Sequence, residues 1–183
     1  MRLETERLIL RRWMTADSEP YAKLNSDPAV MEFLLKPLSR EESDAMIGRM
    51  EAHFGEHGFG PWAVEVKATG ELAGFTGLTR VAFETHFTPC VEVGWRLARA
   101  FWGKGFATEA ARAALAFGFE SAGLKEIVSF TVPANGRSIA VMERLGMKRD
   151  PQEDFDHPKV PEGHPLRPHV LYRMKREEFI HDR

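Results

Sequence analysis

The chain contains short segments in which apolar and polar residues alternate, separated by segments whose apolar residues return every third or fourth position. The first spacing predicts strands with one buried face, and the second predicts amphipathic helices. Together with the turn residues between them, these patterns predict strands over residues 7–12, 62–67, 72–81, 88–97, 126–132 and 169–175. The residues Ala68-Thr69-Gly70 join two of these strands into a hairpin.

Helices are expected between the strands, over residues 15–24, 39–54, 105–122 and 138–145. Thr15 can cap the first helix. Ser39 and Glu42 fit a capping box at the start of the second, because each side chain can accept a hydrogen bond from the other's main-chain N–H. Gly146 can end the last helix. A stripe of small residues lets helix 105–122 approach a sheet closely: Ala107, Ala110, Ala111 and Ala114.

The order of these elements determines the expected fold class. Antiparallel neighbours are combined with a strand-helix-strand crossover, which predicts a mixed sheet. With 183 residues, of which 43% are hydrophobic, the chain has the size of one domain and can build a core. We therefore expect a single domain of the α/β (α+β) class over residues 1–183.

Charge gives a first indication of the ligand. The formal net charge is −2, so nothing global points to nucleic acid or to a membrane surface. Residues 96–112 and residues 133–149, however, each carry a local charge of +3. Two basic segments in a weakly acidic chain suit a small polyanion. Ordinary solvated helix charge explains any single one of these residues equally well.

Cysteine use and the N-terminal residues bear on the compartment. Cys90 is the single cysteine, which excludes an internal disulfide and fits a reducing compartment. A structural thiol is favoured over a nucleophile at this position. The opening residues MRLETERLIL lack the long apolar stretch of a signal peptide, and no segment approaches the length of a membrane span. A cytoplasmic location is therefore expected.

The most informative segment is a strand, a glycine loop and a helix start over residues 91–109. Small residues expose main-chain N–H groups, and the first N–H groups of a helix have no internal partner and lie at the positive end of its dipole. A phosphate-bearing ligand is therefore expected near residues 103–108. A P-loop is excluded because no GxxxxGK[ST] occurs, and the dinucleotide fingerprint is met only in part. A plain tight turn is the remaining alternative.

Three segments in this order resemble the GNAT superfamily of acetyltransferases: LETERLILR at residues 3–11, WGKGFATEA at residues 102–110 and NGRSIAVMERLGM at residues 135–147. The likeness is strongest to the ribosomal-protein N-terminal acetyltransferases. The resemblance implies a mixed sheet of about seven strands with helices on both faces, and a splay between the fourth and fifth predicted strands. It also implies acetyl-CoA as donor, an amine as acceptor, and no metal, and it is compatible with a homodimer.

The same resemblance assigns the donor site. The pantetheine arm would pair with the strand at Trp95, Arg96 and Leu97, and the diphosphate would lie on the loop. Trp102 stands where the family usually has Gln or Arg. The expected acetyl-CoA-binding residues are Trp95, Arg96, Leu97, Trp102, Gly103, Lys104, Gly105, Phe106, Ala107, Thr108, Asn135, Ser138 and Arg144.

Two residues are expected to carry the chemistry. The attacking amine must be neutral, so a base is expected to take up its proton. Glu92 is the candidate, because it matches the strand position where several relatives carry a catalytic glutamate. A structural carboxylate is its alternative role. Many relatives place a proton-donating tyrosine seven residues after the motif asparagine, but that position here is Met142. Ser138 is the expected replacement, and a helix N-cap is its alternative role.

The acceptor cannot be named from the sequence. The proline-rich segment 154–165, with Phe33 and Trp62, is expected to shape its pocket. Metal binding by the histidines of this region is disfavoured because no ligand spacing supports it, and Tyr172 is expected to pack in the core. A non-catalytic acetyl-CoA sensor is the competing function, favoured by Met142 and opposed by Glu92 and Ser138.

Overall fold

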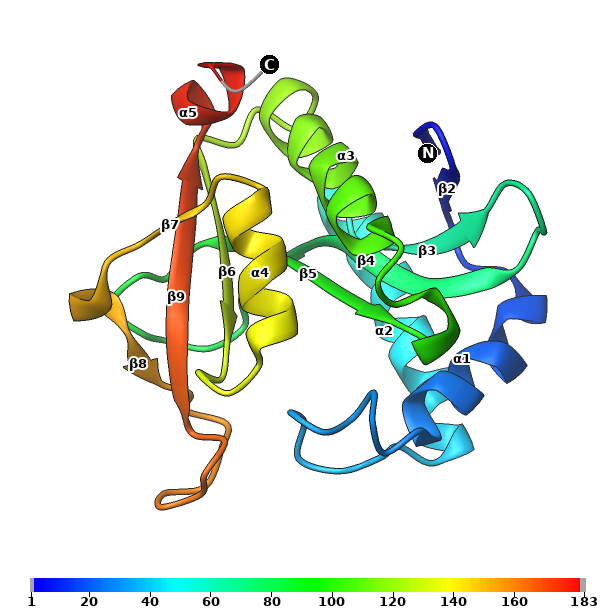
Figure 1. Ribbon diagram of the computed structural model, residues 1–183, viewed down its shortest axis with the longest axis horizontal. Coiled ribbons are helices and arrows are strands. Elements are labelled where there is room, and N and C mark those ends of the chain that lie inside the picture. The colour runs from blue at the N-terminus through cyan, green and yellow to red at the C-terminus, as the bar shows by residue number, and fades with distance from the viewer. Residues whose placement is uncertain (1, 182–183) are drawn as a thin grey trace.

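A computed structural model describes residues 2–181, with the side chains of the last two of these residues left undescribed. The expected domain, residues 1–183, extends past these limits, so Met1, Asp182 and Arg183 lie outside the described residues. A single mixed sheet of nine strands runs through the structure in the order β1-β2-β3-β4-β5-β6-β9-β7, and β8 pairs with β9 (Figure 1). The expected mixed sheet is confirmed.

Six of the strands have four or more residues and correspond to the six predicted ones. They are β2 (Leu8–Arg11), β3 (Pro61–Val66), β4 (Leu72–Arg80), β5 (Val91–Leu97), β6 (Glu126–Thr131) and β9 (Pro168–Lys175). The remaining three have two residues each and are not predicted: β1 (Leu3–Glu4), β7 (Lys148–Arg149) and β8 (Phe155–Asp156). The predicted number of about seven strands is therefore too low, because a strand of two residues is too short to show an alternation of apolar and polar positions.

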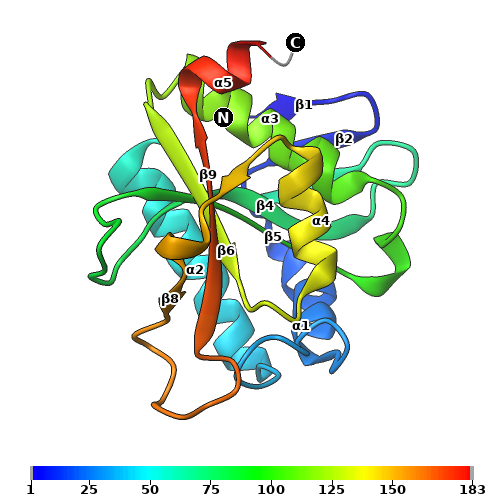
Figure 2. The same cartoon turned by 60° about the vertical axis from the view of Figure 1, so that its left-hand side comes forward.

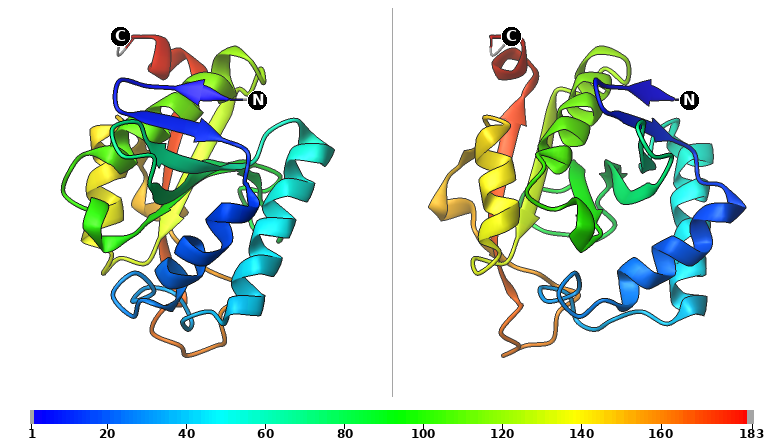
Figure 3. Two further views of the ribbon diagram at one scale, coloured as in Figure 1. Left: turned by 90° about the vertical axis from the view of Figure 1, so that its right-hand side faces the viewer. Right: turned by 45° about the vertical axis from the view of Figure 1, so that its right-hand side comes forward.

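Helices cover both faces of the sheet, as predicted. α3 (Phe106–Glu120) and α4 (Gly136–Arg144) lie together on one face, and α1 (Ser18–Ser26) and α2 (Arg40–His57) lie together on the other (Figures 2 and 3). A short helix, α5 (Arg176–His181), follows β9. Three single turns of 3₁₀ helix occupy Thr15–Asp17, Arg99–Phe101 and Pro151–Glu153.

Two helix starts differ from the predictions. Thr15 is the first residue of the 3₁₀ turn before α1 and not a cap, and the side chain of Asp17 accepts from the N–H of Met14 instead. α4 begins at Gly136, so Ser138 lies inside its first turn and Asn135 is the cap. Asparagine accepts a main-chain hydrogen bond as well as serine does, so the sequence did not separate the two.

The other caps follow the predictions. The Ser39 hydroxyl accepts from Glu42 N–H at 3.2 Å, and the Glu42 carboxylate accepts from Ser39 N–H at 2.8 Å. Gly146 follows α4 with a φ of 83°. Ala110, Ala111 and Ala114 are fully buried on the inner face of α3. Their small side chains allow the close approach between helix and sheet that the sequence predicted.

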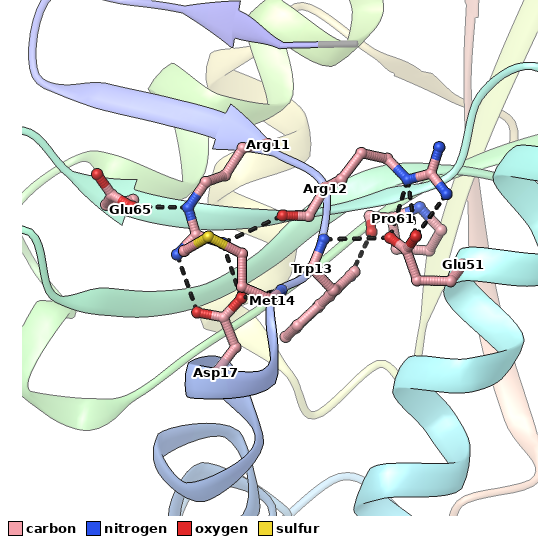
Figure 4. Close-up of polar contacts among 8 residues, drawn as sticks. All are labelled: Arg11, Arg12, Trp13, Met14, Asp17, Glu51, Pro61 and Glu65. Atoms are coloured by element: carbon pink, nitrogen blue, oxygen red, sulfur yellow. Dashed lines mark hydrogen bonds and ion pairs between the residues drawn. The ribbon is translucent and has the colours of Figure 1, made fainter.

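A buried ion network fastens α1 to the sheet. Arg11 on β2 donates to both oxygens of Asp17, at 2.7 and 2.9 Å, and to Glu65 on β3 at 2.6 Å (Figure 4). Beside it, Arg12 binds Glu51 of α2 (Figure 4). Hydrogen bonds to Asp17 above all hold the pKa of Arg11 above its ordinary value, although burial opposes this. The network fixes α1 and α2, which lie on either side of the segment that reaches the functional site.

β5 and β6 part shortly after they meet. They run parallel and share a single register pair, Glu92 with Val128, whereas β5 is paired with β4 along its whole length. Figure 1 shows the two strands diverging from that point. From Val93 onward, β5 has no hydrogen-bonded strand on its β6 side within residues 2–181. The splay that the family resemblance implied is therefore present.

Candidate active site

A cavity of about 1370 Å³ occupies the space where β5 and β6 separate. Its walls come from β5, the loop after it, α3, α4 and the end of β6, and it also reaches the segment between α1 and α2. Twelve of the thirteen residues predicted to bind acetyl-CoA line it, and so does Glu92. The exception is Lys104.

The loop after β5 presents main-chain N–H groups to this cavity. Gly103 and Gly105 adopt φ values of 72° and 78°, in the left-handed region that favours glycine, and Gly105 caps α3. The first helical hydrogen bond there runs from Glu109 N–H to Gly105 O. In the described part of the chain, no acceptor contacts the N–H groups of residues 103–108. Such a set of donors at a helix N-terminus suits an anion.

The N-terminal segment clamps this loop in place. The carboxylate of Glu109 accepts from the Thr5 hydroxyl at 2.5 Å, from Arg7 N–H at 2.9 Å and from Arg7 Nε at 2.7 Å. Arg7 also donates to Lys104 O at 2.9 Å and lies over the ring of Phe106. The N-terminal segment LETERLILR therefore has a structural role, which is to hold the start of α3.

Lys104 differs from expectation, and Trp102 uses its polar group within the turn. Lys104 does not line the cavity, because its main-chain carbonyl is held by Arg7 and its ammonium group lies 5.5 Å from the ring of Phe101. Trp102 lines the cavity, but its indole N–H donates to Leu97 O at 2.7 Å. The ring therefore braces the turn, and its N–H is not available to a phosphate.

Asn135 and Ser138 form a small polar cluster at the start of α4. The Asn135 side chain accepts from Ser138 N–H at 3.2 Å and donates to the hydroxyls of Thr131 and Ser138, at 3.0 and 3.1 Å. The Ser138 oxygen thus accepts a hydrogen bond, which leaves its own O–H free to donate into the cavity that it lines. Arg144, at the end of α4, lines the cavity as well, and its carbonyl accepts from Arg112.

Glu92 lies at the inner end of the splay. It borders the cavity, and a Cβ placed on Gly94 would come 3.7 Å from its Oε1 atom. Burial raises the pKa of Glu92 to about 8, and no described residue donates a hydrogen bond that would lower it. A carboxyl group with such a pKa can take up a proton near neutral pH far more readily than an exposed glutamate.

Other candidate groups are less suited to chemistry. Burial, followed by the nearby charge of Glu92, raises the pKa of Cys90 to about 11, so the thiol stays protonated at neutral pH. Met142, where many relatives carry tyrosine, is 1% exposed and cannot donate a proton. Tyr172 packs in the core, as predicted, with its hydroxyl 3.5 Å from Glu143.

The side of the cavity that faces α1 and α2 is largely apolar. Val30, Phe33 and Leu34 approach it from the segment between these helices, and Phe75 lies on β4. Phe33 is therefore at the cavity as expected. Arg137 crosses the opening, since it pairs with Glu32 at 2.7 Å and its guanidinium lies 4.4 Å from the ring of Trp102.

Two predictions about the acceptor pocket are wrong. Trp62 is fully buried, and its ring packs on Phe54 and Phe117 at centroid distances of 5.4 Å. None of residues 154–165 lines the cavity. This segment instead joins an aromatic cluster with Phe83 and Phe130. Phe155 and His157 are held in that cluster, so the substrate-facing role that the family resemblance implied for this segment does not agree with the cavity lining.

The histidines of this region belong to the same cluster. The rings of His157 and His169 lie 5.0 Å apart, and burial lowers the pKa of His157 to about 4. Among residues 2–181 no group of three or more His, Cys, Asp or Glu side chains could hold a metal ion. None of the helices in the described part of the chain combines the length and apolar character that a membrane span requires.

Several cavity residues were not predicted from the sequence. Some lie within the recognised motifs and others on elements far from them in the chain: Thr5, Glu6, Val30, Leu34, Phe75, Gly94, Glu109, Arg112, Ala113, Ala116, Phe101, Ser129, Phe130, Thr131, Gly136, Arg137, Ala140, Val141 and Met142. For Thr5 and Glu109 a signal existed, since both lie inside segments that carried the family resemblance.

Comparison with known proteins agrees with this geometry. The family described as "Acetyltransferase (GNAT) domain" matches residues 7–148. A Bacillus subtilis protein, the uncharacterised N-acetyltransferase YnaD, is 26% identical over 98% of this chain and 99% of its own length. The FsC-acetyl coenzyme A-N(2)-transacetylase of Aspergillus fumigatus is 31% identical over 86% of this chain and 69% of its own length.

Solved structures show the same fold. An acetyltransferase of the GNAT family from Bacillus anthracis superposes with a TM-score of 0.81 at 26% identity and covers 97% of this chain and 100% of its own. A structure from Vibrio cholerae, named as a proposed ribosomal-protein-serine acetyltransferase, gives a TM-score of 0.76 at 18% identity, covering 96% and 97% of the two chains. The second likeness concerns the fold alone.

Proposed function

Since this chain belongs to the GNAT family of acetyl-CoA-dependent N-acetyltransferases, we propose that acetyl-CoA enters the splay between β5 and β6 and that a primary amine attacks its thioester directly beside Glu92. The observation that carries this proposal is the coincidence of three features at one cavity. The parallel strands part immediately after Glu92, the adjoining loop offers unpaired N–H groups, and the carboxyl group has a raised pKa.

Main-chain groups of the loop and of β5 are suited to bind acetyl-CoA. The N–H groups of residues 103–108 suit the diphosphate, and the small side chains of Gly105 and Ala107 leave room for it. The unpaired side of β5 from Val93 onward suits the amide-bearing pantetheine arm, which can pair with it as an added strand would. A free strand N–H at this edge also suits the oxygen on which negative charge develops.

The chemistry requires a neutral amine. Glu92 in its ionised form accepts the proton of the ammonium group, directly or through water, and the amine nitrogen then bonds to the acetyl carbon as the carbon–sulfur bond breaks. An α-amine has a pKa of roughly 8 and a lysine-type amine one of roughly 10.4, so the base matters more for the second. The nitrogen loses a proton as the amide forms, and Ser138, with its free O–H, relays a proton to the departing thiolate and takes that proton up in its place.

The acceptor class beyond a primary amine is a finer proposal. The resemblance of residues 3–11, 102–110 and 135–147 favours the branch of ribosomal-protein N-terminal acetyltransferases, in which the acceptor is a peptide N-terminus. A small-molecule amine is the other candidate. A panel of short N-terminal peptides and small amines, assayed by acetyl-CoA consumption, separates these; binding of acetyl-CoA without any amine-dependent turnover would favour a sensor instead.

Introducing a negative charge at Ala107 tests the proposed donor site. This residue lines the cavity in the first turn of α3, where a carboxylate favours the helix but would repel a diphosphate. Ala107→Glu is expected to weaken coenzyme A binding roughly 100-fold, measured by calorimetry. Ala107→Gln adds nearly the same bulk without charge and should lose much less.

Circular dichroism and thermal melting verify that both variants at Ala107 keep their helices. Equal affinities of the Glu and Gln variants for coenzyme A would contradict the assignment of residues 103–108 to the diphosphate, because only charge distinguishes the two side chains.

A further inference from the structure

Arg96 is a half-buried cation that has no carboxylate partner among the described residues. Its guanidinium donates to Oδ1 of Asn25 at 2.7 Å, and Sδ of Met46 is a distant second contact at 3.9 Å. Asn25 is itself fully buried and is held by a hydrogen bond to the hydroxyl of Ser43 at 2.9 Å. Since a guanidinium has five N–H donors, most of those of Arg96 have no acceptor among the described residues.

The other enclosed arginines of this protein are paired. Arg11 binds Asp17 and Glu65, and Arg173 binds Glu126 and Glu153. Removing a cation from water without a counter-ion is costly. Burial lowers the pKa of Arg96, and the one group that opposes this, the Tyr21 phenol, has a raised pKa and is uncharged at neutral pH. The unpaired guanidinium of Arg96 therefore favours the binding of an anion, and Arg96 lines the cavity.

The side chain of Arg96 lies away from the coenzyme loop. Successive side chains of a strand point to opposite faces, and Val91, Val93 and Leu97 of β5 enter the core beneath α3. Arg96 points to the opposite face, toward α1 and over the ring of Phe75, whose centroid is 5.6 Å away. A diphosphate on the N-terminus of α3 would not satisfy it.

Glu92 and Gly94 share the face of β5 on which Arg96 lies. Gly94, which has no side chain, lies between Glu92 and Arg96 on this face. The floor of the cavity is therefore unobstructed from the carboxyl group of Glu92 to the guanidinium of Arg96. The two residues are four apart, or about 13 Å along a strand. The apolar residues Val30, Phe33 and Phe75 border this space.

We infer that the acceptor is a primary amine that also carries a carboxylate several bonds away, and that Arg96 binds this carboxylate while the amine lies at Glu92. The inference rests on the proposed function. A carboxylate is favoured because its two oxygens match the planar fork of a guanidinium. An α-amino acid is too short to reach both residues, whereas an ω-amino acid or a short peptide with a free C-terminus has the required length.

Matched acceptor pairs test this inference. ε-Aminocaproate is compared with ε-aminocaproamide, and triglycine with triglycine amide, at saturating acetyl-CoA. Within each pair the amine is the same and only the distant carboxylate differs. The acid is expected to have a kcat/KM roughly 10- to 100-fold above that of its amide, the range for a hydrogen bond to a charged group.

Arg96→Met removes the charge while keeping an apolar chain over Phe75, and it should bring each acid-to-amide ratio close to one. Arg99→Met is the matched control, because Arg99 is an exposed cation near the same end of β5 and contacts only Asp27, at 3.9 Å; it should keep the preference. Thermal melting of each variant checks folding, and if Arg96→Met does not fold, the ratio in the unaltered protein decides.

The outcomes separate the two proposals. Transfer to acids and amides at equal rates would overturn the role of Arg96 and leave the acetyl transfer intact. Faster transfer to the amides would overturn it as well. No transfer to any amine in this set or in the wider panel would overturn the proposed function itself, and with it this inference.

Discussion

At the scale of single residues, the environment of Glu92 determines what its carboxyl group can do. Burial raises its pKa to about 8, so the group changes charge in the range where amines also lose their protons. An exposed glutamate would be ionised at neutral pH but too weak a base to take a proton from an ammonium group. Glu92 is therefore well placed as the proton acceptor that we propose.

Replacing Glu92 by Gln should change both the rate and its dependence on pH. With a lysine-type acceptor amine, whose own pKa is roughly 10.4, kcat/KM of the unaltered enzyme should rise through about pH 8 as Glu92 ionises. Glu92→Gln should be slower by roughly 100-fold at neutral pH and should rise only as the amine itself loses its proton. Steady-state rates across the pH range measure this, and identical profiles would remove Glu92 from the mechanism.

The same residue should influence stability, which provides an independent check. Because the folded protein holds the proton of Glu92 up to about pH 8 and the unfolded chain releases it near 4.5, the stability contributed by this group is present below the lower value and is lost as pH rises through the higher one. Gln at this position does not ionise, so the Glu92→Gln variant does not lose this stability as pH rises. Its melting temperature should therefore exceed that of the unaltered protein at pH 9 but not at pH 5.

At the scale of elements, the start of α3 is held by residues from a turn about a hundred positions away. Burial raises the pKa of Glu109, but the hydrogen bonds from Thr5 and from the main chain and side chain of Arg7 outweigh it and keep the pKa below its ordinary value. These contacts position the loop whose N–H groups we assign to the diphosphate. They link the N-terminal motif to donor binding without any contact between that motif and the thioester.

Glu109→Gln should therefore raise the KM for acetyl-CoA while changing kcat much less, because it loosens the clamp and leaves Glu92 in place. A loss of stability of about 1–2 kcal/mol should accompany this change. Ser39→Ala is the matched control, since it removes the cap of α2 at a similar cost of about 1 kcal/mol but lies outside the cavity. An equal rise in KM in both variants would mean that stability alone, and not the clamp, controls binding.

At the scale of the whole molecule, the helices that border the acceptor side are attached to the sheet through charge as well as apolar packing. Arg11 lies between Asp17 and Glu65, with side-chain exposures of 14%, 4% and 21%, whereas Arg12 and Glu51 are 44% and 31% exposed. Buried and exposed pairs differ greatly in what their disruption costs. The two adjacent arginines therefore allow a direct comparison.

Arg11→Met should destabilise the protein by about 3 kcal/mol, because it leaves the buried Asp17 carboxylate without its cation. Arg12→Met should cost about 1 kcal/mol or less, because Glu51 stays in contact with water. Denaturant unfolding at neutral pH and low salt measures both. Equal losses would show that the connection between β2 and α1 does not depend on the buried ion pair.

Local interactions explain which elements were predictable. The capping box of Ser39 and Glu42 joins residues three apart, and the alternation within β3, β4 and β5 is readable in each strand separately. β1, β7 and β8 exist because another strand pairs with each of them, and two residues give no pattern of their own. Trp62 was misplaced because an aromatic residue on a strand can face a pocket or a core, and the sequence does not say which.

The sequence by itself determined the local form of the loop that we propose for the donor, because the left-handed turns at Gly103 and Gly105 and the free N–H groups at the start of α3 depend on adjacent residues. The tertiary structure alone decided the acceptor side. The pKa of Glu92 depends on what surrounds it, and the lack of a counter-ion at Arg96 becomes visible only when α1 brings Asn25, 71 positions away, against its guanidinium. Desolvation and charge pairing are set by neighbours in space, and the order of residues does not record them.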